Sequence, residues 1–299
     1  MDKDKTIIIY NSVKYFLPFF NQKGIKAYPV YKEVGFLSQI LRKVFGYLGL
    51  NRYYWYGEWK NQLSNTSVSN VVIFANDEDD IWNTLRNRGL SIIFWYWNPT
   101  KIYSKALPIN LPKEFMPYSF DPEDCKEFKM EFNTTFYFNN IELPVRQKKY
   151  EILFVGMDKG RKSQLEDFRL RLKELNISNL IYIVSNRNFL GKHAGNKPIG
   201  YSQYLKYISE SNAILDLIQD RQSGLTLRAM ESIFFSKKLI TNDLTIVNQQ
   251  FYNENNVFII GKDKLEDLKE FVRTPYLPLE TSIVEYYDVN NWLTRFSIN

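Results

Sequence analysis

Residues 222–232 read Gln-Ser-Gly-Leu-Thr-Leu-Arg-Ala-Met-Glu-Ser, and residues 237–242 read Lys-Lys-Leu-Ile-Thr-Asn. They follow an apolar stretch at 213–218 that is typical of a buried strand, and the polar residues with one glycine precede a helix expected from about Thr226. Such a loop places backbone N–H groups and a helix N-terminus at the carboxyl edge of a sheet, where anions bind well. One turn further on, Glu231 can face the same cleft and accept hydrogen bonds from hydroxyl groups. The segment therefore predicts a site for an anionic ligand that carries hydroxyls.

Strands and helices are expected to alternate on both sides of this stretch. In the second half, strands are predicted at 150–155, 181–184, 213–218, 238–241 and 257–260, and helices at 162–175, 201–209, 226–235, 247–252 and 264–272. Short strands joined by helical crossovers predict a Rossmann-like domain that binds ligands at the carboxyl ends of its strands.

The first half shows the same alternation, with strands predicted at 6–10, 71–75, 90–96 and 114–119 and helices at 34–48 and 79–88. Pro144 and a basic cluster mark residues 143–149 as a linker, which places a domain boundary near residue 145. A terminal helix is expected to pack on the body through Val289, Trp292, Leu293 and Phe296.

Composition narrows the function classes. The 299 residues are 44% hydrophobic and 16% aromatic, and the net charge of +6 favours anionic partners such as nucleotides, phospholipid head groups and nucleic acid. The cations are scattered among 33 acidic residues, so nucleic-acid binding ranks third. Cys125 is the single cysteine, which excludes an intrachain disulfide and a cysteine-based zinc site. His193 is the single histidine, and a solvated loop residue is its favoured interpretation. The longest apolar run, 90–97, is too short to span a bilayer, and we expect a cytoplasmic protein.

The order of small polar residues, Gly-Leu, a helix with an inward Glu and a strand ending in Thr-Asn resembles the donor-binding region of GT-B glycosyltransferases. More narrowly, residues 201–242 and the segment Ser-Phe-Asp-Pro-Glu-Asp-Cys at 119–125 resemble small bacterial transferases that build capsule and lipopolysaccharide. The resemblance implies an α/β fold of two Rossmann-like domains that face a central cleft. Residues 1–145 would bind the acceptor, residues 146–282 would bind a nucleotide sugar, and residues 283–299 would cross back to the first domain.

The resemblance also assigns a donor site. The turn Gly156-Met157-Asp158-Lys159-Gly160-Arg161 would lie under the donor diphosphate, with Lys159 and Arg161 neutralising the leaving nucleotide. The alternative is a solvated turn with two surface charges. Glu231 would bind the ribose, or else pair on the helix surface with Lys237 or Lys238. The backbone N–H groups offered to the diphosphate would come from Ser223, Gly224, Leu225 and Thr226.

Basic residues and a helix N-terminus meet the donor charge in this interpretation, so we expect no required metal and no cofactor beyond the donor itself. The run Asp77-Glu78-Asp79 is accordingly not assigned as the metal-binding Asp-X-Asp of the other large transferase fold.

Acceptor groups are expected at the strand ends of the first half. Asn11, Trp97 and Asn98 are the predicted contacts. An inverting transferase needs a base near the acceptor hydroxyl, for which Asp77 is the first choice and Asp121 the second. Ordinary helix N-capping is the alternative role for both carboxylates.

The sequence thus favours a transferase that moves a sugar from a nucleotide sugar to a surface glycan, with a lipid-linked oligosaccharide as the expected acceptor. The rival is a non-catalytic nucleotide- or glycan-binding protein of doubly wound fold. Residues 32–52 could bring the enzyme to the inner face of the plasma membrane, because Arg42, Lys43 and Arg52 flank an apolar helical pattern. A core-facing helix with a solvated rim is the favoured interpretation of that pattern.

Overall fold

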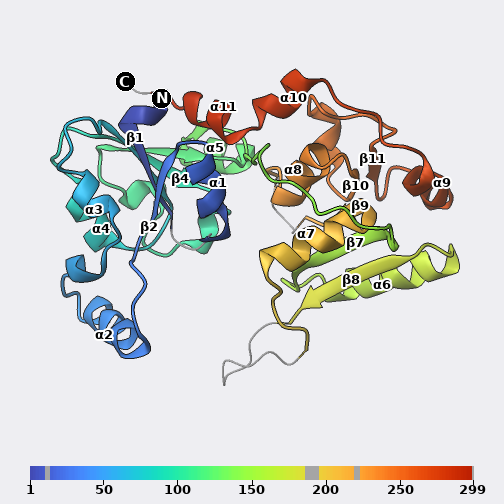
Figure 1. Cartoon of the computed structure of the whole chain (residues 1–299), viewed down its shortest axis with the longest axis horizontal. Coiled ribbons are helices and arrows are strands. Elements are labelled where there is room, and N and C mark those ends of the chain that lie inside the picture. Colours follow the sequence, from blue (N-terminus) through green and yellow to red (C-terminus); the bar gives the residue numbers. More distant parts are fainter. Residues whose placement is uncertain (11–13, 186–194, 219–222, 298–299) are drawn as a thin grey trace. The chain divides into compact units, whose positions relative to one another are not determined.

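The chain folds as two compact units (Figure 1). The computed structural model describes residues 1–10, 14–185, 195–218 and 223–297. Unit 1 comprises Met1–Thr134 together with Val289–Asn299, and unit 2 comprises Thr135–Asp288. The division therefore falls before the linker expected at 143–149. None of the described helices has the length and apolar character needed to span a bilayer.

Unit 1 contains a six-stranded parallel sheet in the order β2-β1-β3-β4-β5-β6. Its central strands are continuously apolar and buried, as expected for a parallel sheet covered on both faces. The strands are β1 (Thr6–Tyr10), β2 (Lys26–Pro29), β3 (Asn70–Phe74), β4 (Ser91–Tyr96), β5 (Phe115–Ser119) and β6 (Glu131–Phe132). The helices are α1 (Leu17–Gln22), α2 (Phe36–Tyr47), α3 (Trp59–Gln62), α4 (Asp79–Leu85), α5 (Pro122–Phe128) and α11 (Val289–Thr294).

The terminal helix α11 belongs to unit 1. Trp292 is fully buried, and its ring packs edge-on against Trp95 at 5.4 Å and Phe296 at 4.7 Å. The Trp292 carbonyl also accepts a hydrogen bond from Asn133 Nδ2 at 3.0 Å. Trp292 and Phe296 are thus part of the core that contains β4.

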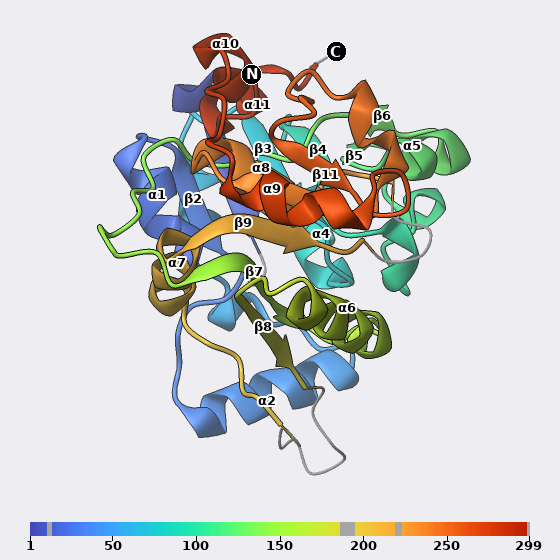
Figure 2. The same ribbon diagram turned by 90° about the vertical axis from the view of Figure 1, so that its right-hand side faces the viewer.

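Unit 2 contains a five-stranded parallel sheet in the order β11-β10-β9-β7-β8. Figure 2 shows β7 between β8 and β9. The strands are β7 (Tyr150–Met157), β8 (Asn179–Val184), β9 (Ser211–Asp216), β10 (Lys238–Thr241) and β11 (Val257–Ile259). The helices are α6 (Lys162–Glu174), α7 (Tyr201–Ser209), α8 (Leu227–Phe234), α9 (Leu268–Arg273) and α10 (Thr281–Tyr286). The predicted α/β fold of two Rossmann-like domains is confirmed.

Two details of the prediction were wrong. Residues 247–252 do not form a regular helix. A short 3-10 helix, Leu244–Asn248, which the Asp243 carboxylate caps, ends within this segment. The helix predicted at 34–48 is α2, and it does not face the core, since none of its residues is buried. Figure 1 shows α2 standing apart from the sheet of unit 1.

Both sheets reverse their strand order at one position. In unit 1 the reversal lies between β1 and β3, and in unit 2 between β7 and β9. Ligands of doubly wound sheets bind in the crevice outside the carboxyl ends of the strands at such a switch point. The loops that follow these four strands are therefore the first places to look for a site.

Candidate functional site

The loop after β7 turns back over the sheet edge of unit 2. Lys159 and Gly160 have φ angles of 46° and 81°, and this left-handed turn leads directly into α6. The next residue, Arg161, is buried with its guanidinium over the strand ends. Its Nη2 donates to the Met157 carbonyl at 3.0 Å, and its Nη1 donates to the Leu217 carbonyl just beyond β9. Arg161 thus joins the ends of the two strands that flank the switch point.

A second guanidinium enters the same edge from α8. Arg228 Nη2 donates to the Val155 carbonyl at 2.8 Å, and Nη1 forms an ion pair with Asp216 at 3.4 Å. The guanidinium lies over the Phe154 ring, 4.8 Å from its centroid. Within the described part of the chain, its buried Nε has no hydrogen-bond partner. The guanidinium is therefore held by these contacts with its Nε–H buried and unpaired.

Packing against Arg228 explains why residue 156 is a glycine. A Cβ at this position would lie 2.2 Å from Arg228 Nη2, well inside contact distance. The predicted role of Gly156 was flexible backbone beneath a diphosphate. The structure shows that its missing side chain makes room for the Arg228 guanidinium.

The N-terminus of α8 is tied to β9. Thr226 is the N-cap, and its Oγ1 accepts hydrogen bonds from the N–H groups of Arg228 at 3.1 Å and Ala229 at 3.3 Å. The same hydroxyl donates to Asp216 Oδ2 at 2.6 Å. Burial raises the pKa of Asp216, and the nearby Arg228 charge opposes that shift. The predicted residues Ser223, Gly224 and Leu225 form the connection that leads into this cap.

Among the described residues at the switch point of unit 2, positively charged side chains outnumber carboxylates. Lys159 lies at the surface of the turn, and partial desolvation together with the charges of Arg161 and Arg228 lowers its pKa. Burial and the Arg228 charge lower the pKa of Arg161 to about 10. The opposing carboxylates are Asp216 and Asp158. Three cations facing two carboxylates make this edge attractive to an anion.

Glu231 lies deeper along α8. It is 3% exposed and accepts a hydrogen bond from the Tyr204 hydroxyl. Burial raises its pKa to about 7, although Tyr204 and the Arg228 charge act in the opposite direction. The surface ion pair considered as its alternative role does not form, because Lys237 and Lys238 donate instead to backbone carbonyls at 2.7 Å.

Tyrosines around Glu231 were not predicted as functional residues. Tyr137 contributes a second hydrogen bond that lowers the Glu231 pKa, and the Tyr137 and Tyr201 hydroxyls are hydrogen bonded to each other. From the sequence, Tyr204 and Leu205 are both expected to be core contacts, and Tyr204 instead donates to Glu231. The signal that was available is its spacing from Tyr201, which puts both rings on one face of α7.

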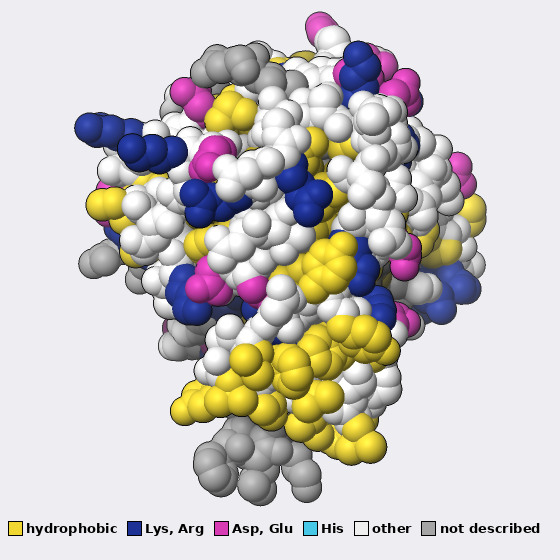
Figure 3. Space-filling view, turned by 90° about the vertical axis from the view of Figure 1, so that its left-hand side faces the viewer, with side chains coloured by type: hydrophobic (Ala, Val, Ile, Leu, Met, Phe, Trp, Pro, Cys, Tyr) yellow, Lys and Arg dark blue, Asp and Glu magenta, His cyan; other side chains and the backbone are white. Residues whose placement is uncertain are grey.

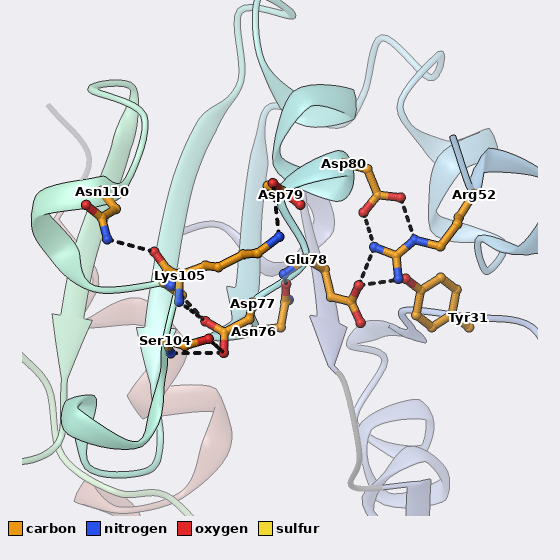
Figure 4. Close-up of polar contacts among 11 residues, drawn as sticks. Tyr31, Arg52, Asn76, Asp77, Glu78, Asp79, Asp80, Ser104, Lys105 and Asn110 are labelled. Atoms are coloured by element: carbon orange, nitrogen blue, oxygen red, sulfur yellow. Dashed lines mark hydrogen bonds and ion pairs between the residues drawn. The ribbon is translucent and has the colours of Figure 1, made fainter. Parts of the chain in front are cut away.

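At the switch point of unit 1, the Asp77 carboxylate has a structural role. Asp77 Oδ1 accepts hydrogen bonds from the N–H groups of Lys105 at 2.8 Å and Ala106 at 2.7 Å, while Oδ2 accepts from the N–H and hydroxyl of Ser104, each at 3.1 Å (Figure 4). Although partial burial opposes them, these hydrogen bonds lower the pKa of Asp77. Asp77 therefore anchors the 104–106 loop and is a weaker base than an ordinary carboxylate.

The remaining acidic residues of this run each have a cationic partner (Figure 4). Arg52 pairs with both Glu78 and Asp80, and the Tyr31 hydroxyl also donates to Glu78 at 3.1 Å. Asp79 pairs with Lys105 at 3.4 Å. No group of three or more potential metal ligands occurs among the residues described in the two units.

Asp121 forms the expected N-cap of α5. Its Oδ1 accepts from the N–H groups of Glu123 at 3.0 Å and Asp124 at 3.3 Å. This geometry favours the capping role over that of a catalytic base. The Trp97 ring packs against Phe74 with the centroids 5.3 Å apart.

Predicted acceptor contacts are described only in part. Trp97 and Asn98 are partly exposed after β4. Asn11 and His193 lie outside the described residues.

A cavity of about 520 Å³ that sequence reasoning did not anticipate opens beside the 104–106 loop. It is lined by Asp79, Trp82, Asn83, Arg86, Ser104, Lys105, Asn110, Leu111 and Pro112.

No protein-family model and no curated protein sequence matches the chain. Among solved structures, the chain is similar to the DNA-modifying enzyme β-glucosyltransferase, whose crystal structure was determined with and without uridine diphosphoglucose. The TM-score is 0.54 and the identity 10%, over 90% of this chain and 89% of that chain. The chain has the GT-B fold. A glycosyltransferase from Rickettsia africae ESF-5 is also similar, with a TM-score of 0.45 and 10% identity over 98% of this chain and 97% of that chain.

Proposed function

We propose that this protein is a glycosyltransferase that moves a sugar from a nucleotide-sugar donor, with the donor bound by unit 2. The observation that carries the proposal is the cation excess of Lys159, Arg161 and Arg228 at the switch point between β7 and β9. The fold supports it, because the β-glucosyltransferase of similar fold uses uridine diphosphoglucose.

The cations have distinct tasks in this proposal. Negative charge grows on the leaving nucleoside diphosphate as the bond to the sugar breaks, and fixed cations stabilise that charge without needing to reorganise. Lys159, which is exposed, and the Arg228 guanidinium, which is partly exposed, contact the diphosphate. Arg161 holds the strand ends that position them. Because protein cations offset the charge, neither a metal nor a cofactor is required.

Glu231 binds the ribose hydroxyls of the donor. Its carboxylate already accepts a phenol hydrogen bond, so the site is built for hydroxyl donors. The helix that carries it also carries Arg228, and one turn separates the two side chains. A single helix thus supplies groups for both the ribose and the diphosphate.

The acceptor is a surface glycan, with a lipid-linked oligosaccharide as the preferred form, and it binds to unit 1. The similarity of residues 119–125 and 201–242 to capsule and lipopolysaccharide transferases supports this choice. The structural neighbour modifies DNA, which makes DNA the competing acceptor. Trp97 and Asn98 remain the proposed acceptor contacts. The hydrogen bonds of Asp77 and Asp121 argue against either residue as the base.

The donor is tested by thermal denaturation with a panel of nucleotide sugars and nucleoside diphosphates. A ligand at 100 times its dissociation constant adds about 2.7 kcal/mol to the free energy of unfolding. Lys159→Ala and Arg228→Ala should each reduce turnover of the stabilising donor by roughly 10 to 1000-fold. Lys173→Ala is the matched control, because it removes the same charge from the opposite end of α6. Equal turnover in all three variants would remove the cation cluster from the proposal.

Transfer is distinguished from simple binding by product analysis. The identified donor, labelled in its sugar, is incubated with lipid-linked glycan or with duplex DNA, with and without EDTA. Label in the glycan fraction supports the proposed acceptor, and label in DNA replaces it. Nucleotide binding without transfer or hydrolysis would favour the non-catalytic rival.

A further inference from the structure

Helix α2 exposes an unusually large apolar surface. Its exposed side chains range from 44% to 92% accessible, and Figure 3 shows hydrophobic side chains gathered on one face of the molecule. We call this surface the α2 apolar face; it consists of Phe36, Leu37, Ile40, Leu41, Val44, Tyr47 and the following Leu48. A surface helix normally turns its apolar stripe toward the core. Here that stripe faces solvent.

The orientation is fixed by contacts on the opposite side of α2. Ser38 Oγ accepts a hydrogen bond from Trp55 Nε1 at 2.8 Å, and the Phe45 ring packs edge-on against Trp55 at 5.1 Å. The Arg42 guanidinium lies over the Tyr31 ring, 4.1 Å from its centroid. At 100° per residue, Ser38, Arg42 and Phe45 lie on one side of the helix and the α2 apolar face on another. The helix is therefore held with its apolar residues pointing outward.

One cation borders the α2 apolar face. Residues 34–57 contain Arg42, Lys43 and Arg52 and no carboxylate, but Arg42 lies over Tyr31 on the opposite side of α2, and Arg52 pairs with Glu78 and Asp80. Lys43 is exposed and borders the apolar arc on the helical wheel. Exposed aromatic residues continue the surface at Tyr53 and Tyr54. Apolar residues with cations and tyrosines at their border are the composition of helices that lie in a bilayer interface.

We propose that the α2 apolar face docks on an anionic lipid bilayer. The twelve residues of α2 span about 18 Å, which suits a helix lying in the interface plane rather than crossing the membrane. The absence of carboxylates from 34–57 complements an anionic surface. The proposal does not depend on the transferase activity.

Vesicle sedimentation tests this proposal with the full chain and no nucleotide. Wild type should bind vesicles of phosphatidylcholine with phosphatidylglycerol more tightly than vesicles of phosphatidylcholine alone, and added salt should weaken that binding. Leu37→Ser/Ile40→Ser/Val44→Ser should weaken binding by at least about 10-fold, because three buried apolar contacts are lost. Lys43→Gln should weaken binding only to the anionic vesicles.

A matched control removes the same kind of side chain elsewhere. Leu170→Ser/Leu244→Ser replaces two leucines that are 61% and 62% exposed in unit 2 and should bind vesicles like wild type. Equal binding by the α2 triple variant and this control would overturn the proposal, as would the absence of binding by wild type. Light scattering supplies a second readout: a wild-type dimer that the triple variant converts to a monomer would identify a second copy as the occupant and overturn the membrane assignment.

Discussion

Gly156→Ala should perturb the candidate donor site by displacing one guanidinium. The added Cβ would lie 2.2 Å from Arg228 Nη2 and 3.2 Å from the Phe154 ring. Gly156 lies in β7, whose extended backbone accepts alanine, and Nη2 is the end of a flexible side chain. The fold should therefore persist while Arg228 moves by more than about 1 Å to reach ordinary contact distance.

The magnitude follows from the contacts that this movement weakens. The hydrogen bond from Arg228 Nη2 to the Val155 carbonyl is 2.8 Å long and has a charged donor, which corresponds to about 1.5–3 kcal/mol. The ion pair with buried Asp216 is already 3.4 Å long and can readjust in part. We expect a loss of about 2 kcal/mol in the free energy of unfolding, or a Tm about 4–8 °C lower. Nucleoside diphosphate affinity should fall about 10-fold.

A double-mutant cycle separates this mechanism from general strain. Unfolding in urea is measured for wild type, Gly156→Ala, Arg228→Ala and the double variant. With Arg228 truncated, the new methyl group occupies space that the guanidinium has left, so Gly156→Ala should cost less than about 0.5 kcal/mol. Gly195→Ala is the control, because its added Cβ would lie 3.6 Å from the nearest atoms, which is an ordinary van der Waals contact. A cost of about 2 kcal/mol for Gly156→Ala in both backgrounds would refute the reasoning.

Three further predictions concern carboxylates. Burial raises the folded-state pKa of Glu231 to about 7, above the unfolded value near 4.5. The contribution of Glu231 to stability is therefore complete below pH 4.5 and is lost as pH rises through 7. Glu231→Gln should accordingly gain stability relative to wild type between pH 5 and pH 8. A constant difference across that range in urea unfolding would contradict the assignment. Asp77→Asn should lower the free energy of unfolding by about 2–3 kcal/mol above pH 5, with the difference shrinking as pH falls through the usual aspartate range, because its hydrogen bonds to the 104–106 loop hold its pKa down. Asp121→Ala should cost about 1 kcal/mol in chemical denaturation and leave donor turnover within twofold, whereas a loss above 100-fold would restore it as a catalytic candidate.

Hydrophobic patterning was sufficient to predict the central strands of both sheets. The stretch 6–10 is continuously apolar apart from its first residue, and it became β1 with the predicted limits. The two edge strands of unit 1 could not be found in this way. In β2 only Ala27 is buried among a lysine, a tyrosine and a proline, and both residues of β6 are exposed. An edge strand is defined by its hydrogen bonds to a neighbour, which leave little trace in local hydropathy.

The orientation of α2 shows a different limit of sequence reasoning. Helical periodicity identified an amphipathic helix, and the usual assumption placed its apolar stripe on the core. Ser38 and Phe45 determine which side of α2 faces the rest of unit 1, because both contact Trp55, which lies later in the chain. A helical wheel contains no information about such a partner, so the outward orientation could be seen only in the structure.

The donor site shows why positions were easier to predict than roles. Strand ends at the switch point are fixed by topology, and the sequence placed Gly156, Arg161 and Thr226 there. In the structure Gly156 leaves space for the Arg228 guanidinium, and Thr226 caps the helix that carries Arg228. Arg161 joins the ends of the strands beneath it. From the sequence alone, Arg228 could equally point to solvent. Its importance arises from what these three residues accomplish together: they hold a partly unpaired guanidinium near Lys159, at the carboxyl edge of the sheet of unit 2. A change in any of the three should therefore act through Arg228, and the coupling between Gly156 and Arg228 measures that dependence directly.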